Sequence, residues 1–226
     1  MIPEERRGHF IVFEGLDGAG KSTQARLLVR QLNFKGEESV LVNPSSRIHA
    51  LYQSLSHSEK TFPPDLSYVL LMLTSRVYQA QTKVAENLRT GKSVVADRYI
   101  QTPLVEAMLR KINLGWQNEI LMGLPRPDLI IYVAVSPETA MRRKKSPTVA
   151  ERGGLMFPRL SKHDAFVSYE SLAMKAYESL CSSNQDWVKI DGDLSIKEVQ
   201  QEILGVVERR LGLVERTSPR TIRNAE

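Results

Sequence analysis

One short segment of the sequence has the residue types and the spacing for binding phosphate groups: Gly15-Leu16-Asp17-Gly18-Ala19-Gly20-Lys21-Ser22. Its glycines allow the backbone to turn so that successive N–H groups point at phosphate oxygens, and a following helix adds its N-terminal dipole. In this pattern Lys21 reaches the β- and γ-phosphates, and the Ser22 hydroxyl binds Mg²⁺. The segment, together with Thr23, therefore predicts a binding site for the phosphates of ATP.

A second group of chemically able residues, Asp97-Arg98-Tyr99, comes at the end of a short apolar run. At the end of a parallel strand, a carboxylate such as Asp97 can orient Mg²⁺ through water. The neighbouring Arg98 can clamp a phosphoryl group during its transfer. For this tripeptide taken alone, the alternative is a salt bridge at the surface.

The elements that must position these residues follow from the hydrophobic pattern. Short apolar runs predict buried parallel strands at 9–14, 39–43, 93–97, 128–135 and 187–191. Helical spacing predicts helices at 21–32, 46–55, 65–89, 102–111, 116–122, 137–144, 162–180 and 196–211. This alternation predicts an α/β fold, a doubly wound five-stranded parallel sheet flanked by helices.

The length of 226 residues fits one domain, which we expect to span 1–212, with a polar tail at 213–226. The stretch 146–158 contains two prolines, the pair Gly153-Gly154 and several charges. Such a composition between two helices predicts a mobile segment over the site.

The bulk composition narrows the function less than the motifs do. A net charge of +5 suits a nucleic-acid binder, but also an enzyme whose substrates are polyanionic nucleotides. The single cysteine, Cys181, cannot form an internal disulfide, and the four histidines lack the spacing of a zinc site. With no secretory signal and no run of about 20 apolar residues, we expect a soluble cytoplasmic protein without membrane contact.

Three segments taken together resemble the thymidylate kinase family: FIVFEGLDGAGKSTQ, DRY and LPRPDLIIYVAVSPETAMRRK. The resemblance runs from about Gly8 to Leu211 and includes Val188-Lys189-Ile190-Asp191, which is similar to the family's last strand near the adenine. It implies a P-loop nucleoside monophosphate kinase that transfers the γ-phosphoryl group of MgATP to dTMP, giving dTDP. It also implies a homodimer packed through long helices, for which the stretch 65–89 is the candidate.

The resemblance also implies roles for individual residues. Asp17 matches the carboxylate placed near the acceptor sugar, and Arg76 matches the arginine that reads the pyrimidine base. Arg98 matches the phosphate clamp, and Thr102 falls where a serine or threonine contacts the base. A lid is implied at about 142–160, with cations for the γ-phosphate from this cluster: Arg142, Arg143, Lys144, Lys145 and Arg152.

At three places the sequence departs from the family pattern. The acceptor-phosphate loop reads Asn43-Pro44-Ser45-Ser46-Arg47, so that Arg47, displaced by one position, is the candidate phosphate ligand. Met72 stands where an aromatic ring commonly stacks on thymine, although a methionine in a helix core is the plain alternative. Glu106 stands near the position beside the deoxyribose, where a carboxylate could bind a sugar hydroxyl or a base amine.

These departures leave two other functions open. The first keeps the fold and the donor and changes the acceptor, to another nucleotide, a nucleoside or a non-nucleotide. The second is a nucleotide-dependent switch or a nucleic-acid-associated ATPase that uses the basic surface. Because the sequence lacks a basic stripe with interleaved aromatic residues, we expect no nucleic-acid partner.

Overall fold

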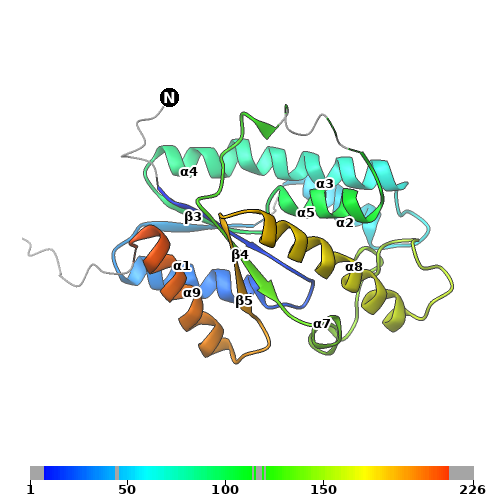
Figure 1. The fold of residues 1–226 in the computed structure, drawn as a ribbon. Helices are drawn as coiled ribbons and strands as arrows, with labels where there is room; N and C mark the ends of the chain where they lie inside the picture. Colours follow the sequence, from blue (N-terminus) through cyan, green and yellow to red (C-terminus); the bar gives the residue numbers. More distant parts are fainter. Residues whose placement is uncertain (1–7, 44–45, 114, 116–118, 120, 214–226) are drawn as a thin grey trace, which may run out of the picture.

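The computed structural model describes residues 8–43, 46–113, 115, 119 and 121–213. Within these residues, parallel strands form one sheet in the order β2-β3-β1-β4-β5 (Figure 1). Its strands are β1 (Phe10–Glu14), β2 (Ser39–Val42), β3 (Ser93–Asp97), β4 (Leu129–Ala134) and β5 (Trp187–Asp191). Because the chain leaves the central β1 toward one edge and returns to build the other, the predicted doubly wound sheet is confirmed.

The central strands are buried along almost their whole length. Every residue of β1 is buried, and so are the first five residues of β4. Strands that are covered on both faces have no solvent side, so their sequences read as continuous apolar runs. This is why the strands could be predicted from their composition.

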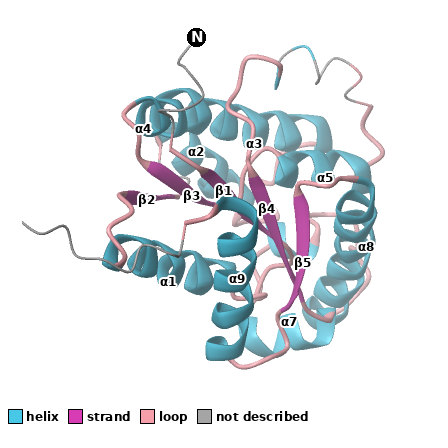
Figure 2. Cartoon of the chain, turned by 60° about the vertical axis from the view of Figure 1, so that its left-hand side comes forward, coloured by secondary structure: helices cyan, strands magenta, loops and turns pink. Residues whose placement is uncertain are grey.

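Helices cover both faces of the sheet (Figures 1 and 2). One face carries α1 (Lys21–Phe34) and α9 (Ile196–Leu211), which pack against each other. The opposite face carries α3 (Asp65–Gln79), α4 (Ala85–Arg89), α5 (Gln101–Leu109) and α8 (Lys162–Ser183). Two shorter helices, α2 (Arg47–Ser56) and α7 (Pro137–Lys144), pack on α3 and α8 respectively.

The long helix predicted at 65–89 is interrupted by a π-helical segment, η2 (Ala80–Val84), between α3 and α4. A π turn contains one residue more than an α turn, so it changes the direction in which the following side chains face. Before it, Tyr68 and Met72 belong to a small apolar cluster near α5. After it, Val84 and Leu88 belong to the main core under the sheet.

Two further expectations concern irregular parts of the chain. The helix predicted at 116–122 lies largely outside the described residues. The segment expected to be mobile, 146–158, contains a short 3-10 turn, η3 (Ala150–Arg152), that packs on α8.

Among the residues described, no helix has both the length and the apolar character needed to cross a membrane.

Candidate active site

A cavity of about 1100 Å³ opens at the carboxyl ends of the strands. Parallel α/β sheets bind ligands at this edge, where the chain turns away to opposite faces. One end of the cavity, here called the P-loop end, is lined by the turn 15–24 and by the end of β3. The other end, here called the helical end, is lined by side chains from α2, α3 and α5.

The turn at the P-loop end joins β1 to α1 as predicted. Its backbone fits tightly against α7, because a Cβ on Gly18 would lie 2.5 Å from the carbonyl oxygen of Ala140, and the φ angle of Gly18 is +91°. The N-cap residue of α1, Gly20, offers no side-chain acceptor, which leaves first-turn N–H groups for a bound anion. Residues 15 and 17–23 line the cavity, whereas Leu16 is buried in the core.

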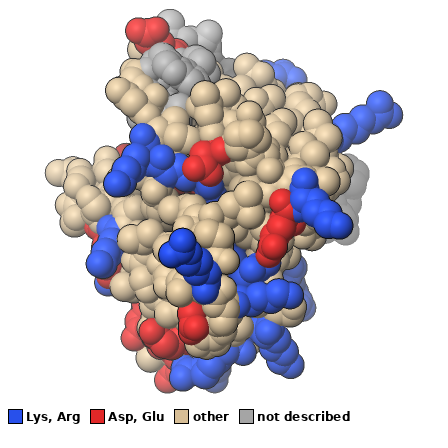
Figure 3. All heavy atoms as spheres, turned by 90° about the vertical axis from the view of Figure 1, so that its right-hand side faces the viewer, with Lys and Arg blue, Asp and Glu red and all other residues tan. Residues whose placement is uncertain are grey.

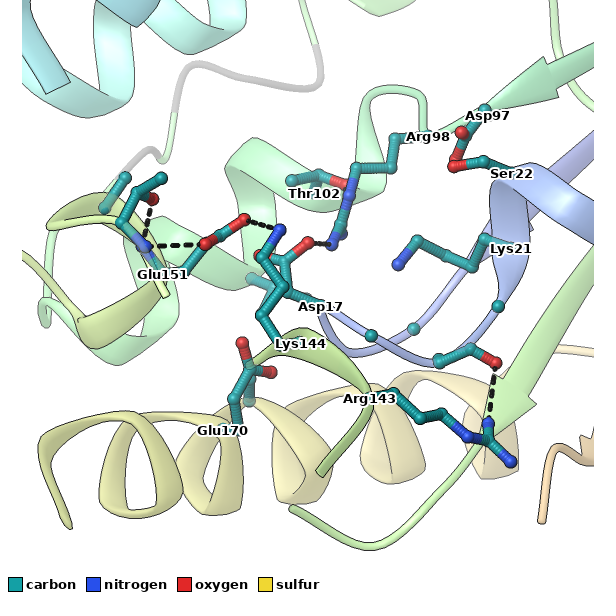
Figure 4. Close-up of a pocket in the computed structure, with 18 of the residues that line it drawn as sticks. Asp17, Lys21, Ser22, Asp97, Arg98, Thr102, Arg143, Lys144, Glu151 and Glu170 are labelled. Carbon is teal, nitrogen blue, oxygen red and sulfur yellow. Dashed lines mark hydrogen bonds and ion pairs between the residues drawn. The ribbon is translucent and has the colours of Figure 1, made fainter. Parts of the chain in front are cut away.

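Lys21 lies across the turn, with Nζ 2.6 Å from the carbonyl oxygen of Leu16. Figure 4 shows its side chain pointing to the centre of the P-loop end. Burial and the nearby Arg98 lower the pKa of Lys21, against the opposite effect of Asp17. A bound phosphate would offset both effects and favour the charged amine.

Asp17 and Arg98 form an ion pair in the middle of the cavity, with 2.5 Å between the Asp17 Oδ1 and Arg98 Nη2 atoms (Figure 4). Burial alone would raise the pKa of Asp17, but Arg98 and then Lys21 hold it at about 2. Arg98 has a positive φ angle of 69°, which is costly for a residue with a side chain. The fold therefore holds a strained arginine at the carboxyl end of β3.

Two oxygen donors line the P-loop end: the Ser22 hydroxyl at the start of α1 and the Asp97 carboxylate at the end of β3 (Figure 4). Among the described residues, no group of three or more His, Cys, Asp or Glu side chains could enclose a metal ion. Mg²⁺ does not need such a cage, because it keeps several waters and binds one or two protein oxygens together with phosphates. The donors present therefore fit Mg²⁺ brought in with ATP.

The two arginines of α7 point in different directions. Arg143 reaches the P-loop, where its Nη1 atom lies 3.5 Å from the carbonyl oxygen of Ala19. Arg142 does not line the cavity, and its Nη2 atom donates to Thr139 of the same helix at 2.8 Å. Adjacent helical residues are separated by about 100°, so only one of the two can face the loop. Lys144 also lines the cavity and pairs with Glu151 (Figure 4).

The segment after α7 packs against residues near the helical end of the cavity. A Cβ on Gly154 would lie 2.3 Å from the Phe62 ring, so the backbone can approach the ring only because this residue is glycine. The Arg152 side chain pairs with Glu59 at 3.2 Å. The turned view of Figure 3 shows basic side chains lying among acidic ones on the lower part of this side of the molecule.

The helical end contains two of the predicted acceptor residues, Met72 and Arg76, one turn apart on α3. Both are buried, with exposed fractions of 3% and 4%. The Nε atom of Arg76 is buried with no hydrogen-bond partner, and its Nη1 atom lies 3.5 Å from Gln79 Oε1. The guanidinium therefore retains capacity to bind a polar group in the cavity.

Helix α2 contributes differently from the prediction. Arg47, the predicted phosphate ligand, is exposed at the first turn of α2 and does not line the cavity. The cavity-facing side of α2 carries His49, Tyr52, Gln53 and Ser56, and His57, which follows the helix, also lines the cavity. Positions 44 and 45 of the predicted acceptor loop lie outside the described residues.

Glu106 lines the cavity, but both of its oxygens have partners. One accepts a hydrogen bond from the Tyr169 hydroxyl, and the other lies 3.2 Å from Arg110 Nε. The Arg110 side chain has no exposed surface, packs over the Tyr68 ring and donates to the carbonyl oxygen of Gly153 at 3.3 Å. Glu106 therefore helps to join α5, α8 and the segment after α7.

Helix α8 supplies lining residues that the motifs did not reveal. Glu170 has an exposed fraction of 2%, and its side chain points toward Asp17 and Lys144 (Figure 4). Burial and the Asp17 charge raise the pKa of Glu170 well above its usual value. The signal was present in the sequence, because Glu170 interrupts a buried stripe at helical spacing that includes Phe166, Tyr169 and Ala173.

Comparison with known proteins gives a consistent picture. The family model described as thymidylate kinase matches residues 13–203. The thymidylate kinase of Legionella pneumophila is 30% identical over 210 residues, covering 89% of this chain and 94% of the relative. The thymidylate kinase of Arabidopsis thaliana is 30% identical over 203 residues, covering 89% of this chain and 71% of the relative. The solved thymidylate kinase of Candida albicans, at 21% identity, superposes with a TM-score of 0.72 over 90% of this chain and 92% of that one.

Proposed function

The chain belongs to the thymidylate kinase family, and we infer that it transfers the γ-phosphoryl group of ATP to dTMP, giving dTDP and ADP. The observation that carries this function is that one cavity has a phosphate-binding turn at one end and a buried arginine, Arg76, at the other. Arg98 stands between them, where two nucleotides bound from opposite ends would bring their phosphates together.

In the reaction, an oxygen of the acceptor phosphate attacks the γ-phosphorus of ATP while the bond to the β,γ-bridging oxygen breaks. Charge spreads over the equatorial oxygens of the transferred group, so the protein acts mainly by positioning and by neutralising charge. We assign this work to Lys21 from the P-loop, Arg98 from β3 and Arg143 from α7. The Arg98–Asp17 ion pair supports the assignment, because it holds the guanidinium in the middle of the cavity.

Ser22 directly and Asp97 through water would hold Mg²⁺, which would neutralise part of the negative charge on the ATP phosphates. The backbone N–H groups of residues 15–23 would hold the remaining phosphate oxygens. These assignments are supported by the hard oxygen donors of the turn and of β3, and by the start of α1, which has no side-chain cap.

The acceptor is assigned to the helical end. Arg76 would hold the pyrimidine base, since its Nε atom is buried without a partner, and Met72 would cover a face of the ring. Asp17 would orient the sugar. Thr102 and Glu106 would shape the pocket, because the hydroxyl and both carboxylate oxygens already bind protein groups. In this conformation we assign no acceptor contact to Arg47 and no contact with the transferred phosphoryl group to Arg142.

Residues 142–160 are proposed to act as a lid. Two contacts support this proposal: Lys144 and Glu151, which both line the cavity, form an ion pair, and Gly154 packs against the Phe62 ring. A closed lid would exclude water and so keep ATP hydrolysis from competing with transfer.

We also propose a homodimer and a cytoplasmic location. Leu66, Leu70 and Tyr78 are spaced by multiples of four along α3, and they are 52%, 36% and 45% exposed. This apolar stripe would pack against the same stripe of a second copy, which sedimentation of the wild-type protein and of Leu70→Glu would test. The location is inferred from the nucleotide substrates and from the lack of a second cysteine in the sequence.

The direct test is a panel of nucleoside monophosphates, supplied one at a time with MgATP in an assay that couples ADP release to an absorbance change. We expect dTMP to give the highest kcat/KM, with dTDP identified by chromatography. A higher kcat/KM for another acceptor would contradict the assignment to dTMP while leaving the P-loop kinase mechanism intact.

A further inference from the structure

Glu14, the last residue of β1, is a buried carboxylate directly beneath the site. Its side chain has no exposed surface. The Oε1 atom accepts the backbone N–H of Tyr99 at 2.9 Å, and Oε2 accepts the hydroxyl groups of Thr102 and Tyr177 at 2.8 and 3.1 Å. The nearest cationic atom to Oε2 is Arg98 Nη1, at 3.9 Å. A buried polar group needs such partners, because burial without a hydrogen bond is destabilising.

These contacts hold the backbone of Arg98 on both sides. The N–H group of Arg98 donates to the carbonyl oxygen of Phe13 at 3.0 Å, and that of Tyr99 donates to Glu14. Arg98 itself has the unfavourable φ angle of 69°. A strained conformation persists only where the surroundings over-determine it, and here β1 supplies both restraints.

The same carboxylate fixes the direction of two hydroxyl protons. Thr102 and Tyr177 each have one hydroxyl proton, and each gives it to Glu14. Their lone pairs therefore face Arg98, whose Nη1 atom donates to them at 3.3 and 3.2 Å. The other terminal nitrogen, Nη2, is left for Asp17 and the cavity.

We propose that Glu14 is a positioning residue for Arg98, acting through the Tyr99 amide and through the hydroxyl groups of Thr102 and Tyr177. Glu14 does not line the cavity, so it reaches the substrates only through these groups. The proposal rests on the proposed function, because it assumes that Arg98 binds the transferred phosphoryl group.

The substitution Glu14→Gln keeps the shape of the side chain and replaces one acceptor oxygen with an NH₂ donor. With the NH₂ group facing the two hydroxyls, these must turn their protons away from it and toward Arg98, which is also a donor. We expect kcat to fall about 10- to 100-fold while KM for ATP stays within about 3-fold of wild type.

A double-mutant cycle separates positioning from stability. In an Arg98→Met background there is no guanidinium left to position, so Glu14→Gln should change kcat by less than about 3-fold. An equal loss of kcat in both backgrounds would overturn the proposal, and so would wild-type kcat in the single variant. Tyr177→Phe, which leaves the carboxylate in place, should lower kcat by a smaller factor of the same kind.

Asp128→Asn is the matched control. Asp128 accepts the backbone N–H of Phe10 at 2.7 Å, at the opposite end of the same strand from Glu14. This variant should lower the melting temperature and leave kcat unchanged. If both variants lower kcat equally, the effect of Glu14 is general destabilisation and the proposal fails.

A crystal structure of Glu14→Gln gives a readout that does not depend on turnover. We expect the Arg98 guanidinium to leave Asp17, and an unchanged Arg98–Asp17 pair would overturn the proposal whatever the enzyme phosphorylates. Failure of the proposed function shows separately, as a wild-type protein that releases no ADP with any nucleoside monophosphate.

Discussion

The two ends of the cavity are built in different ways. The P-loop end consists largely of neighbouring residues where β1 leads into α1, namely 15 and 17–24, so its shape depends on one short stretch of sequence. The helical end consists of side chains from α2, α3 and α5, which are far apart in the sequence. A backbone site depends on local conformation, whereas a side-chain site depends on how helices are packed and rotated. Substitutions at the P-loop end should therefore mainly lower kcat. Substitutions at the helical end should mainly raise KM for the acceptor.

The largest expected effect is at the P-loop end. Lys21→Ala removes a cation from the β- and γ-phosphates, and kcat should fall about 10²- to 10³-fold. The fold should survive, because the turn is held by glycines and by the packing on α7. Turnover measured by ADP release and melting measured by circular dichroism would check both parts. Wild-type turnover in this variant would show that Lys21 and its turn do not take part in catalysis.

The second-largest expected effect is at the helical end. Arg76→Ala should raise KM for dTMP about 10- to 100-fold, because a charged hydrogen bond to the base is lost, and should leave KM for ATP nearly unchanged. Arg89→Ala, at the end of α4, is the control for loss of one positive charge. A change confined to ATP affinity would show that the two ends are not separate binding sites.

The smallest effect is a pH dependence of the helical end. Burial and then the nearby Arg76 lower the pKa of His49 to about 4, from 6.5 in the unfolded chain. Between these values the unfolded chain binds a proton that the folded protein does not, so the free energy of unfolding falls as the pH drops. Because the ring is partly exposed, we expect a contribution of about 1 kcal/mol between pH 7 and pH 4.

Denaturant unfolding of the wild type and of His49→Gln at pH 7, 6 and 5 would measure this contribution. The variant should lose less stability than the wild type as the pH falls. The other three histidines are common to both proteins, so their contribution cancels. Parallel pH profiles would contradict the low pKa.

The same contrast explains what the sequence could predict. Buried strands and a phosphate-binding turn are local patterns, and all of the expected strands were confirmed. The π turn at 80–84 was missed, because no proline or glycine marks it. The directions of Arg142 and Arg143 were not predictable, since both lie in one basic run and only the docking of α7 decides which faces the loop.

At the helical end the sequence pointed to the right helices but not to all of the side chains. Met72, Arg76 and Glu106 do line the cavity, whereas Arg47 lies outside it. The side of α2 that faces the cavity could not be known before α2 was packed on α3. Glu14 was not predicted for another reason: it is the last residue of an apolar strand, and its hydrogen-bond partners are distant in the sequence. These partners are Tyr99, Thr102 and Tyr177.

The π turn between α3 and α4 has a consequence for how this part of the chain can change. Without a loop between them, α3 directs Arg76 into the cavity and α4 directs Leu88 into the core. Removing one residue from 80–84 would restore a regular α-helix and rotate one half against the other by roughly 100°. Either Arg76 or Leu88 would then no longer face the cavity or the core, respectively. This segment should therefore accept exchanges of residue type far more readily than any change of length.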